Sequence, residues 1–397
     1  MTWPVVPLEN ALNSALVFVD GDWVESKDQD PDGDVRLIQL ADIGDGYYVN
    51  KSNRFLTSDA ARRLKCTFLE TGDLLIARMP DPLGRACIFP GDSKRTVTVV
   101  DVCIIRPDSN TVHPPWLMHC INSPQSRNQI DEYTTGTTRQ RISRGNLAKI
   151  KIALPPLEEQ RRIAAILDQA ETLRTQRRTA LALLDGLTQS LFLDMFGDPV
   201  VNPKGWEKHA LQTICEAIND CPHSTPEWTE SGMVCLRTSN LTAGDWDWRD
   251  TRYVSEDTFH ERSKRGYLRP GDIVLSREGT VGIAAIVQTG MALCMGQRLV
   301  QLRPDAEVLA PGYLLRHLLY VLSPSRISQL MVGSTSQHLN VKELRALQIP
   351  LPPLPLQQTF ATRIACIEAL KASHRHALTA LDALFASLQQ RAFAGQL

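Results

Sequence analysis

The sequence predicts an α+β protein with two tandem globular parts, each followed by a long helix, the two helices pairing as an antiparallel coiled coil. Three observations predict this class: an internal repeat, two long runs of heptad-spaced apolar residues, and β-rich runs confined to the segments before them. The chain has 397 residues, of which 43% are hydrophobic and 22% charged. This length and composition are typical of a chain with more than one buried core.

The internal repeat appears when the chain is compared with itself at a shift of 197 residues (333 − 136). Gly136–Ile142 then falls on Gly333–Leu339, and the register continues without a gap through Leu154–Leu157, which falls on Leu351–Leu354. Gly72-Asp73-Leu74-Leu75 echoes Gly271-Asp272-Ile273-Val274 more loosely. The chain is therefore a tandem duplication with a pseudo-two-fold internal repeat.

Each globular part mixes short β-rich runs with turns. Val97–Ile105 and Ile273–Ser276 are predicted strands, and Pro114–Met118 and Pro311–Leu319 are predicted short helices. The expected segments are a first globular domain over 1–153, a first helix over 154–197, a second globular domain over 198–350 and a second helix over 351–397.

The long helices are predicted from apolar residues at alternating spacings of three and four, which is typical of coiled coils. The expected seam consists of Ile163, Ile166, Ala170, Leu173, Arg177, Ala180, Leu184, Leu187 and Leu191 in the first copy, and of Phe360, Arg363, Ile367, Leu370, His374, Ala377, Leu381, Leu384 and Leu388 in the second. Its polar members, Arg177, Arg363 and His374, either set the register or lie at a solvated edge. A helix of about 35 residues is roughly 50 Å long.

Composition and motifs exclude several classes of protein. No run of residues is long and apolar enough for a membrane span, and no secretory signal is recognisable at the start, so we expect a cytoplasmic protein without a membrane partner. The nine cysteines form no C-x-x-C pair, and Cys215, Cys221 and His223 lack a fourth zinc ligand, so reduced core thiols are expected and no metal. The net charge of −1 limits any DNA-binding surface to a local patch.

Catalytic motifs are also missing. The chain has no G-x-x-x-x-G-K-[ST] phosphate loop, and no nucleophile, acid–base or metal constellation occurs in both copies. A duplicated chain without a duplicated catalytic set favours recognition over catalysis, which argues against a nuclease or methyltransferase. A coiled-coil scaffold that binds only protein is the alternative to a DNA-reading function.

Several motifs resemble a known family. Leu154–Leu167 is similar to the opening of the central helix in specificity subunits of type I restriction–modification systems. Phe196–Pro199 with Asn202–Trp206 resembles that family's junction into its second recognition domain, and Gly271–Arg277 with Gly279–Gly282 resembles a motif of its target recognition domains. The resemblance covers the whole chain in the family's order of domain, helix, domain, helix.

The resemblance implies a non-catalytic subunit that binds double-stranded DNA. Each domain would read one half of a bipartite, asymmetric target, and the paired helices would fix the unread gap and dock two methyltransferase (M) subunits. Separate restriction/translocase (R) subunits would translocate and cut the DNA. This chain would hold no cofactor, since S-adenosylmethionine, ATP and Mg are expected in the partner subunits.

Two sets of residues are candidates for DNA contact. A polar loop before each helix carries amide, guanidinium and hydroxyl groups, which can bond bases or phosphates. These residues are Thr137, Thr138, Arg139, Gln140 and Arg141 in the first copy, and Ser334, Thr335, Ser336, Gln337 and His338 in the second. The alternative for both loops is a simple turn and cap. Arg78 and Arg277 follow matching strands and are expected either to contact phosphate or to form surface salt bridges.

Overall fold

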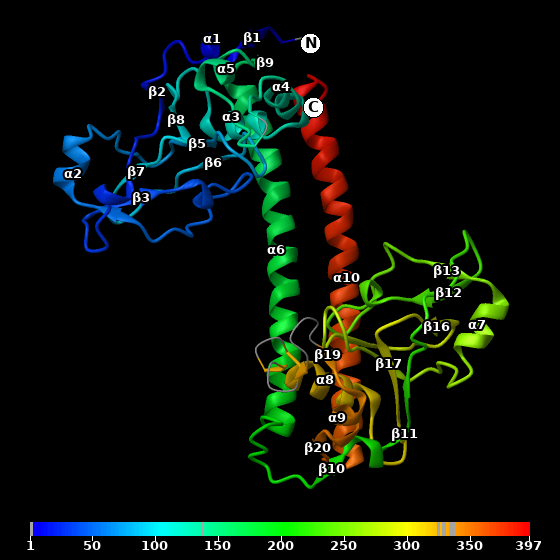
Figure 1. Cartoon of the computed structure of the whole chain (residues 1–397). Helices are drawn as coiled ribbons and strands as arrows, with labels where there is room; N and C mark the ends of the chain where they lie inside the picture. The colour runs from blue at the N-terminus through cyan, green and yellow to red at the C-terminus, as the bar shows by residue number, and fades with distance from the viewer. Residues whose placement is uncertain (1–2, 137, 324–325, 328–330, 333–337) are drawn as a thin grey trace. The chain divides into compact units, whose positions relative to one another are not determined.

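A computed structural model describes the chain except for residues 1–2, 137, 324–325, 328–330 and 333–337. The chain divides into two compact units: unit 1 is Met1–Arg178 with His376–Leu397, and unit 2 is Thr179–Arg375. The long helices α6 (Leu157–Phe196) and α10 (Leu354–Phe393) each contribute one part to either unit (Figure 1). The division between the two units thus falls within each long helix.

Unit 1 contains three small sheets. The largest has the strand order β2-β8-β5-β6 and is antiparallel throughout, the second has the order β4-β3-β7 with β3 and β7 parallel, and β1 pairs with β9. The strands are β1 (Val5–Pro7), β2 (Val17–Asp20), β3 (Val35–Ile38), β4 (Phe55–Leu56), β5 (Leu74–Ala77), β6 (Ala86–Ile88), β7 (Arg95–Thr98), β8 (Val102–Arg106) and β9 (Lys151–Ala153). The short helices are α1 (Leu8–Ala11), α2 (Ser58–Arg63), α3 (Pro114–Ile121), α4 (Pro124–Glu132) and α5 (Arg144–Ala148).

Unit 2 repeats this arrangement. Its sheets have the orders β11-β17-β14-β15, β13-β12-β16 and β10-β20, with β12 and β16 parallel, and β18 pairs with β19. The strands are β10 (Lys208–Ala210), β11 (Cys215–Asp220), β12 (Met233–Leu236), β13 (Tyr253–Val254), β14 (Ile273–Ser276), β15 (Ala284–Ile286), β16 (Leu293–Met295), β17 (Leu299–Pro304), β18 (Met331–Val332), β19 (His338–Leu339) and β20 (Gln348–Pro350). The short helices are α7 (Glu256–Arg262), α8 (Pro311–Val321) and α9 (Val341–Ala346).

The matching sheets show that the duplication extends from sequence to topology. The predicted strand Ile273–Ser276 is β14, and the predicted helices begin with Pro114 in α3 and Pro311 in α8, where the fixed φ of proline suits the first turn. The predicted strand Val97–Ile105 is wrong, because this run forms two strands in different sheets. The amide of Val102 bonds back to the carbonyl of Val99 at 3.0 Å, which closes a tight turn inside the run.

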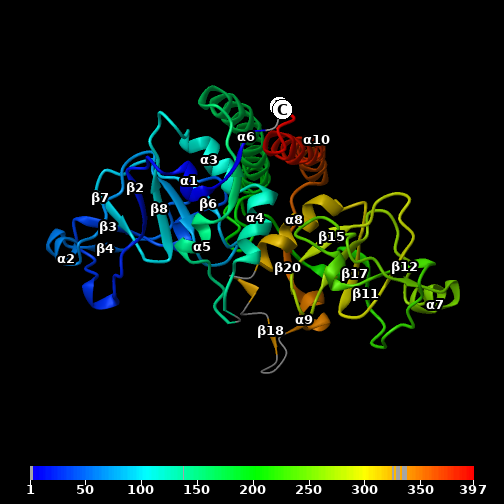
Figure 2. The same cartoon turned by 90° about the horizontal axis from the view of Figure 1, so that it is seen from above.

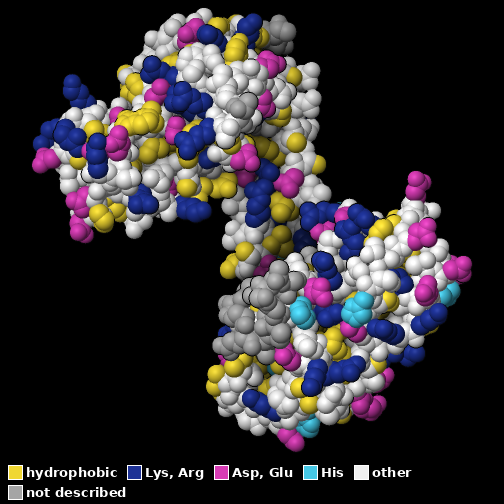
Figure 3. Space-filling view, viewed as in Figure 1, with side chains coloured by type: hydrophobic (Ala, Val, Ile, Leu, Met, Phe, Trp, Pro, Cys, Tyr) yellow, Lys and Arg dark blue, Asp and Glu magenta, His cyan; other side chains and the backbone are white. Residues whose placement is uncertain are grey.

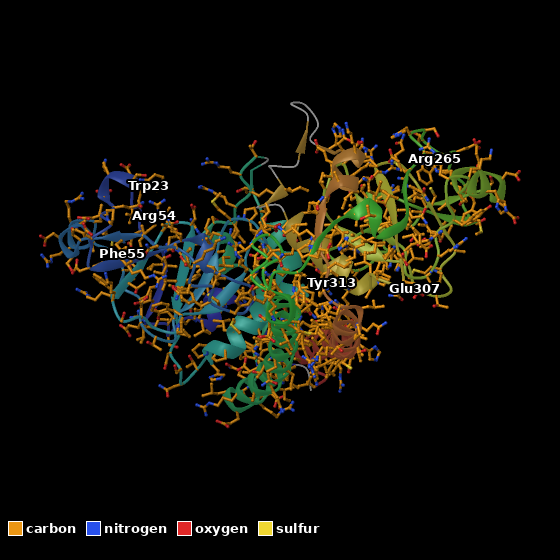
Figure 4. All side chains as sticks on the ribbon, turned by 90° about the horizontal axis from the view of Figure 1, so that it is seen from below. Trp23, Arg54, Phe55, Arg265, Glu307 and Tyr313 are labelled. Carbon is orange, nitrogen blue, oxygen red and sulfur yellow. The ribbon has the colours of Figure 1, made fainter. Side chains whose placement is uncertain are left out.

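Each unit has its own main core between its largest sheet and the long helices. In unit 1, Trp116 of α3 is buried with Ile163 and Leu167 of α6 and Ala392 of α10. In unit 2 the core is rich in aromatic rings, namely Phe192, Phe196, Tyr313 and Phe360, whose centroids lie 4.7–5.8 Å apart. Tyr313 points into this interior, and its hydroxyl donates to the carbonyl of Pro350 (Figure 4).

Within each unit α6 and α10 lie side by side with opposite directions (Figures 1 and 2). In unit 1 the Nε of Arg174 lies 2.7 Å from Oδ1 of Asp382, and Arg162 donates to the carbonyl of Leu397 at 2.8 Å. In unit 2 the Nζ of Lys371 lies 2.6 Å from Oδ1 of Asp185. No helix within the part of the chain that the structure describes is long and apolar enough to span a membrane.

Five of the eighteen residues of the predicted seam are exposed. Ile163 and Phe360 are buried, but Leu173, Leu187, Leu370 and Leu384 are 41–49% exposed, at positions related by the repeat. Of the side chains directly after them, Thr188 and Lys371 are buried, and Arg174 and Phe385 are half-buried. A straight α-helix has 3.6 residues per turn, so a strict heptad pattern drifts by about 20° per heptad and leaves the contact line. Of the polar seam members, Arg363 is exposed, whereas Arg177 and His374 are half-buried.

Candidate nucleic-acid interface

The candidate site in each unit lies at one edge of the largest sheet, where three strand ends meet. Arg78 directly follows β5, and Arg277 directly follows β14. Both side chains are only 8% exposed. Each side chain extends past one neighbouring strand and pairs with the last residue of the strand beyond it. Arg78 extends past β8, and its Nη1 lies 2.8 Å from Oδ1 of Asp20 in β2. Arg277 extends past β17, and its Nε lies 3.2 Å from Oδ1 of Asp220 in β11. We call this edge, with its buried ion pair, the strand-end edge.

Arg78 and Arg277 are both buried in the structure. Arg78 and Arg277 were expected to contact phosphate or to form surface salt bridges. In the structure their buried guanidinium groups form ion pairs with the partly exposed carboxylates of Asp20 and Asp220. Removing one partner of such a pair leaves an uncompensated buried charge. The pairs therefore hold the edge together, and a phosphate contact would require them to open.

The polar loop of the first copy lies directly against this edge. The carbonyl of Arg78 accepts the amide of Ile142 at 3.1 Å, and Thr135 and Arg141 exchange backbone hydrogen bonds of 3.0 and 2.9 Å that close the loop. Thr138, Arg139, Gln140 and Arg141 are all exposed, and Thr137 lies outside the described residues. The loop thus presents polar side chains to solvent beside the ion pair, and it also makes the turn that was the alternative interpretation.

The second copy attaches its loop in the same way. The amide of Leu339 donates to the carbonyl of Arg277 at 2.9 Å, and His338 pairs with Glu278 as an isolated β-bridge. Ser334, Thr335, Ser336 and Gln337 lie outside the described residues. The structure therefore places Thr138–Arg141 beside Arg78 in the first copy, and His338 beside Arg277 in the second.

Some residues of the edge were missed by the sequence analysis. Asp20 and Asp220 lie 200 positions apart (220 − 20), whereas the repeat was detected at 197, so insertions between the copies hide their equivalence. In unit 2 the side chain of Arg265 fixes this end of β11 by donating to the carbonyls of Asp220 and Cys221 at 3.3 and 3.2 Å, and Figure 4 shows Arg265 in the globular part of that unit. An arginine that bonds backbone carbonyls leaves no spacing signal in the sequence.

Among the residues that the structure describes, different basic side chains are exposed around the edge in the two copies. Unit 1 presents Arg139 and Arg141, whereas unit 2 presents His223 and Arg298. Lysine and arginine side chains are visible over the globular parts of both units, mixed with acidic ones (Figure 3). Such local basic groups suit contacts with a phosphate backbone and with base edges.

Two free thiols lie at the two ends of β11: Cys221 directly follows the strand at the strand-end edge, and Cys215 begins it at the other end. Cys221 is buried, and burial raises the pKa of its thiol; burial likewise raises the pKa of Cys215 to about 12. Both groups are therefore protonated at neutral pH. Among the residues that the structure describes, no group of three or more His, Cys, Asp or Glu side chains is placed to hold a metal ion.

Comparison with known proteins decides the family. Residues 18–182 and 203–380 match the family described as the type I restriction modification DNA specificity domain, once for each copy. The chain belongs to this family. As a specificity subunit it recognises a DNA target and is not itself an enzyme.

Relatives of known type agree with this assignment. The chain is 24% identical over 348 residues to the type I restriction enzyme MjaVIII specificity subunit of Methanocaldococcus jannaschii, covering 82% of this chain and 80% of that protein. It is 22% identical over 331 residues to the EcoBI specificity subunit of Escherichia coli, covering 75% and 68%.

Solved structures show the same fold. An S subunit from M. genitalium aligns over 99% of this chain and 96% of its own, with 13% identity and a TM-score of 0.61. A chain from a structure on the assembly of the type I R-M system aligns over 100% and 98%, with 22% identity and a TM-score of 0.58.

Proposed function

We propose that each unit of this specificity subunit reads one half of a bipartite DNA target through its strand-end edge. The observation that carries the proposal is the duplicated frame: both units keep the same sheets, the same buried ion pair and the same loop attachment, while the exposed side chains on that frame differ. Because base contacts carry sequence information and the scaffold does not, a shared frame with different side chains supports two readers of unlike half-sites.

The direct test is binding of labelled duplexes by the complete complex. We expect the complex to bind a duplex with both half-sites far more tightly than one in which either half is scrambled, and the affinity to fall as salt rises. A chain that serves only as a protein-binding scaffold would bind all three duplexes alike. A complex in which charge-reversing changes at Arg139 and Arg141 leave recognition of the first half-site intact would place the interface elsewhere.

We propose that the exposed leucines of the helix pair dock two methyltransferase subunits. Leu173 and Leu384 belong to unit 1, and Leu187 and Leu370 belong to unit 2. The ion pairs between the antiparallel helices set their register, which places the two leucines of each unit opposite one another. Apolar side chains repeated along paired helices are the surface that a further helix packs against. Since the two surfaces are equivalent under the repeat, they suit two copies of one partner.

The helices would also act as the spacer of the target. A helix of forty residues is about 60 Å long, which exceeds one turn of B-DNA at about 34 Å, so it can separate two readers along the duplex. In this proposal the chain holds no cofactor of its own. S-adenosylmethionine is carried by the methyltransferase subunits, and ATP with Mg by restriction/translocase subunits that complete the assembly.

A further inference from the structure

The backbone at Arg298 adopts a conformation that is unusual for its residue type. Arg298 has a φ of +67°, in the left-handed region that favours glycine. It stands in the connection between β16 and β17, and its carbonyl accepts the amide of Arg277 at 3.0 Å. A non-glycine residue held in this region is strained, and such strain is found preferentially at functional sites. The strand-end edge thus holds an arginine where a glycine would fit with less strain.

The side chain of Arg298 is held at the surface of this edge and remains accessible. It is 58% exposed, with Nε 3.4 Å from Oε2 of Glu278. The other oxygen of Glu278 lies 3.6 Å from Nη2 of Arg277, so the buried ion pair is continued outwards to Arg298. A guanidinium held by a carboxylate at one side keeps donors on the other, and paired donors of this kind match O6 and N7 of guanine.

The first copy places the opposite charge at the same point of the frame. There the carbonyl of Asp101 accepts the amide of Arg78 at 2.9 Å, as that of Arg298 accepts the amide of Arg277. The structural task at this position is therefore performed by the backbone carbonyl, which any residue supplies. The side chain is not needed for this backbone bond, and it changes from the carboxylate acceptor of Asp101 to the guanidinium donor of Arg298.

We propose that Arg298 is a specificity-determining residue that bonds the major-groove edge of a guanine in the half-site read by unit 2, with Glu278 orienting its guanidinium. The inference rests on the proposed function, because it requires the strand-end edge to face DNA. Asp101 occupies the equivalent place in unit 1, where a carboxylate accepts from the amino group of cytosine rather than donating to guanine.

The test uses the complete complex with Arg298→Gly, a change that suits the positive φ and so preserves the fold. Binding is measured on the cognate duplex and on duplexes with each base pair of either half-site changed in turn. We expect affinity for the cognate duplex to fall about 5- to 150-fold, with discrimination lost at one G·C pair of the unit 2 half-site and kept at every other position. Arg298→Lys, which keeps the charge but not the planar fork, is expected to lose the same discrimination.

The matched control is Arg269→Ala, an exposed arginine just before the opposite end of β14, which is expected to leave discrimination unchanged. Weakening that is uniform over all duplexes, with a shallower salt dependence, would make Arg298 a phosphate contact and overturn the proposal. Unchanged binding by Arg298→Gly would overturn it as well. A second experiment separates a failure of the Arg298 proposal from a failure of the proposed function. Residues 200–350 are exchanged for those of a relative; if this exchange does not change one half-site, the proposed function is wrong and not the role of Arg298 alone.

Discussion

At the scale of single residues, the buried ion pairs are the feature on which the candidate interface depends. Arg277 is buried and its Nε lies 3.2 Å from Oδ1 of Asp220, so that carboxylate compensates its charge. The sequence predicted that Arg78 and Arg277 belong to the site, because both follow matching strands. It did not predict their burial or their partners, since an ion pair that crosses an intervening strand joins residues far apart in the chain.

We therefore expect Asp220→Asn to destabilise unit 2 by about 3 kcal/mol, at the lower end for a buried pair because the carboxylate is 24% exposed. The measurement is thermal unfolding, and Asp20→Asn is the matched change in unit 1. Replacing both members of the unit 2 pair by apolar residues, as in Asp220→Leu with Arg277→Met, should recover most of the loss. A single substitution without effect on unfolding would show that the pair does not hold the edge.

A buried histidine predicts how unit 2 responds to acid. Burial lowers the pKa of His317 to about 3, and neither ring nitrogen has a hydrogen-bond partner among the residues that the structure describes. Because the folded pKa lies below the ordinary value of about 6.5, the unfolded chain takes up a proton first, and stability that is present above pH 6.5 is lost as the pH falls toward 3. Between pH 7 and pH 5 the loss amounts to about 2 kcal/mol. We expect the chain with His317→Leu to lose less stability over this range in urea unfolding; equal losses would contradict the assignment.

At the scale of elements, the sequence predicted where the long helices begin and end better than it predicted which of their side chains face the partner helix. The helices begin at Leu157 and Leu354, each directly after a proline pair, close to the expected starts at 154 and 351. The heptad pattern identified which residues are apolar, but it could not separate those that face the partner helix from those left exposed. That division depends on the drift of a straight helix against a heptad and on the groups packed beside it.

The exposed leucines predict how the partner subunits bind. We expect Leu173→Glu with Leu384→Glu to remove one methyltransferase subunit, and Leu187→Glu with Leu370→Glu to remove the other. All four changes together should remove both subunits, because a charge buried in a helix–helix contact loses its solvation. Native mass spectrometry of the complex measures the stoichiometry. Ala182→Glu, also exposed on α6 but on another face, is the control. Full assembly of the fourfold variant would exclude this surface as the docking site.

At the scale of the whole molecule, the repeat made the architecture predictable. A repeat, two helices and β-rich runs were sufficient to predict the α+β class, and the matching sheets of the two units confirm the duplication in the fold. The division into two units was not predictable, because it depends on which part of each helix packs against which globular part. The strand-end edge was not predictable either, since three strands distant in sequence build it.

The spacer role of the helices predicts a change in the target. Inserting four residues after Thr179 lengthens α6 by about 6 Å, close to two base pairs at roughly 3.4 Å each. A coiled coil absorbs such a stutter by local unwinding. We expect the half-sites to stay the same and the unread gap to lengthen by one or two base pairs, as read from methylated DNA. A variant that still assembles and keeps the original gap would show that the helices do not set it.

The central claim is that the two units read their half-sites independently, and exchange of one unit's globular part tests it most directly. Residues 200–350 are replaced by the corresponding segment of a relative with a different target, and the chimaera is expressed with its methyltransferase subunits. Mapping methylated adenines in the host DNA then gives the new target. The duplicated frame predicts that one half-site changes to that of the relative and the other is retained. A target in which both halves change, or neither does, would contradict the claim.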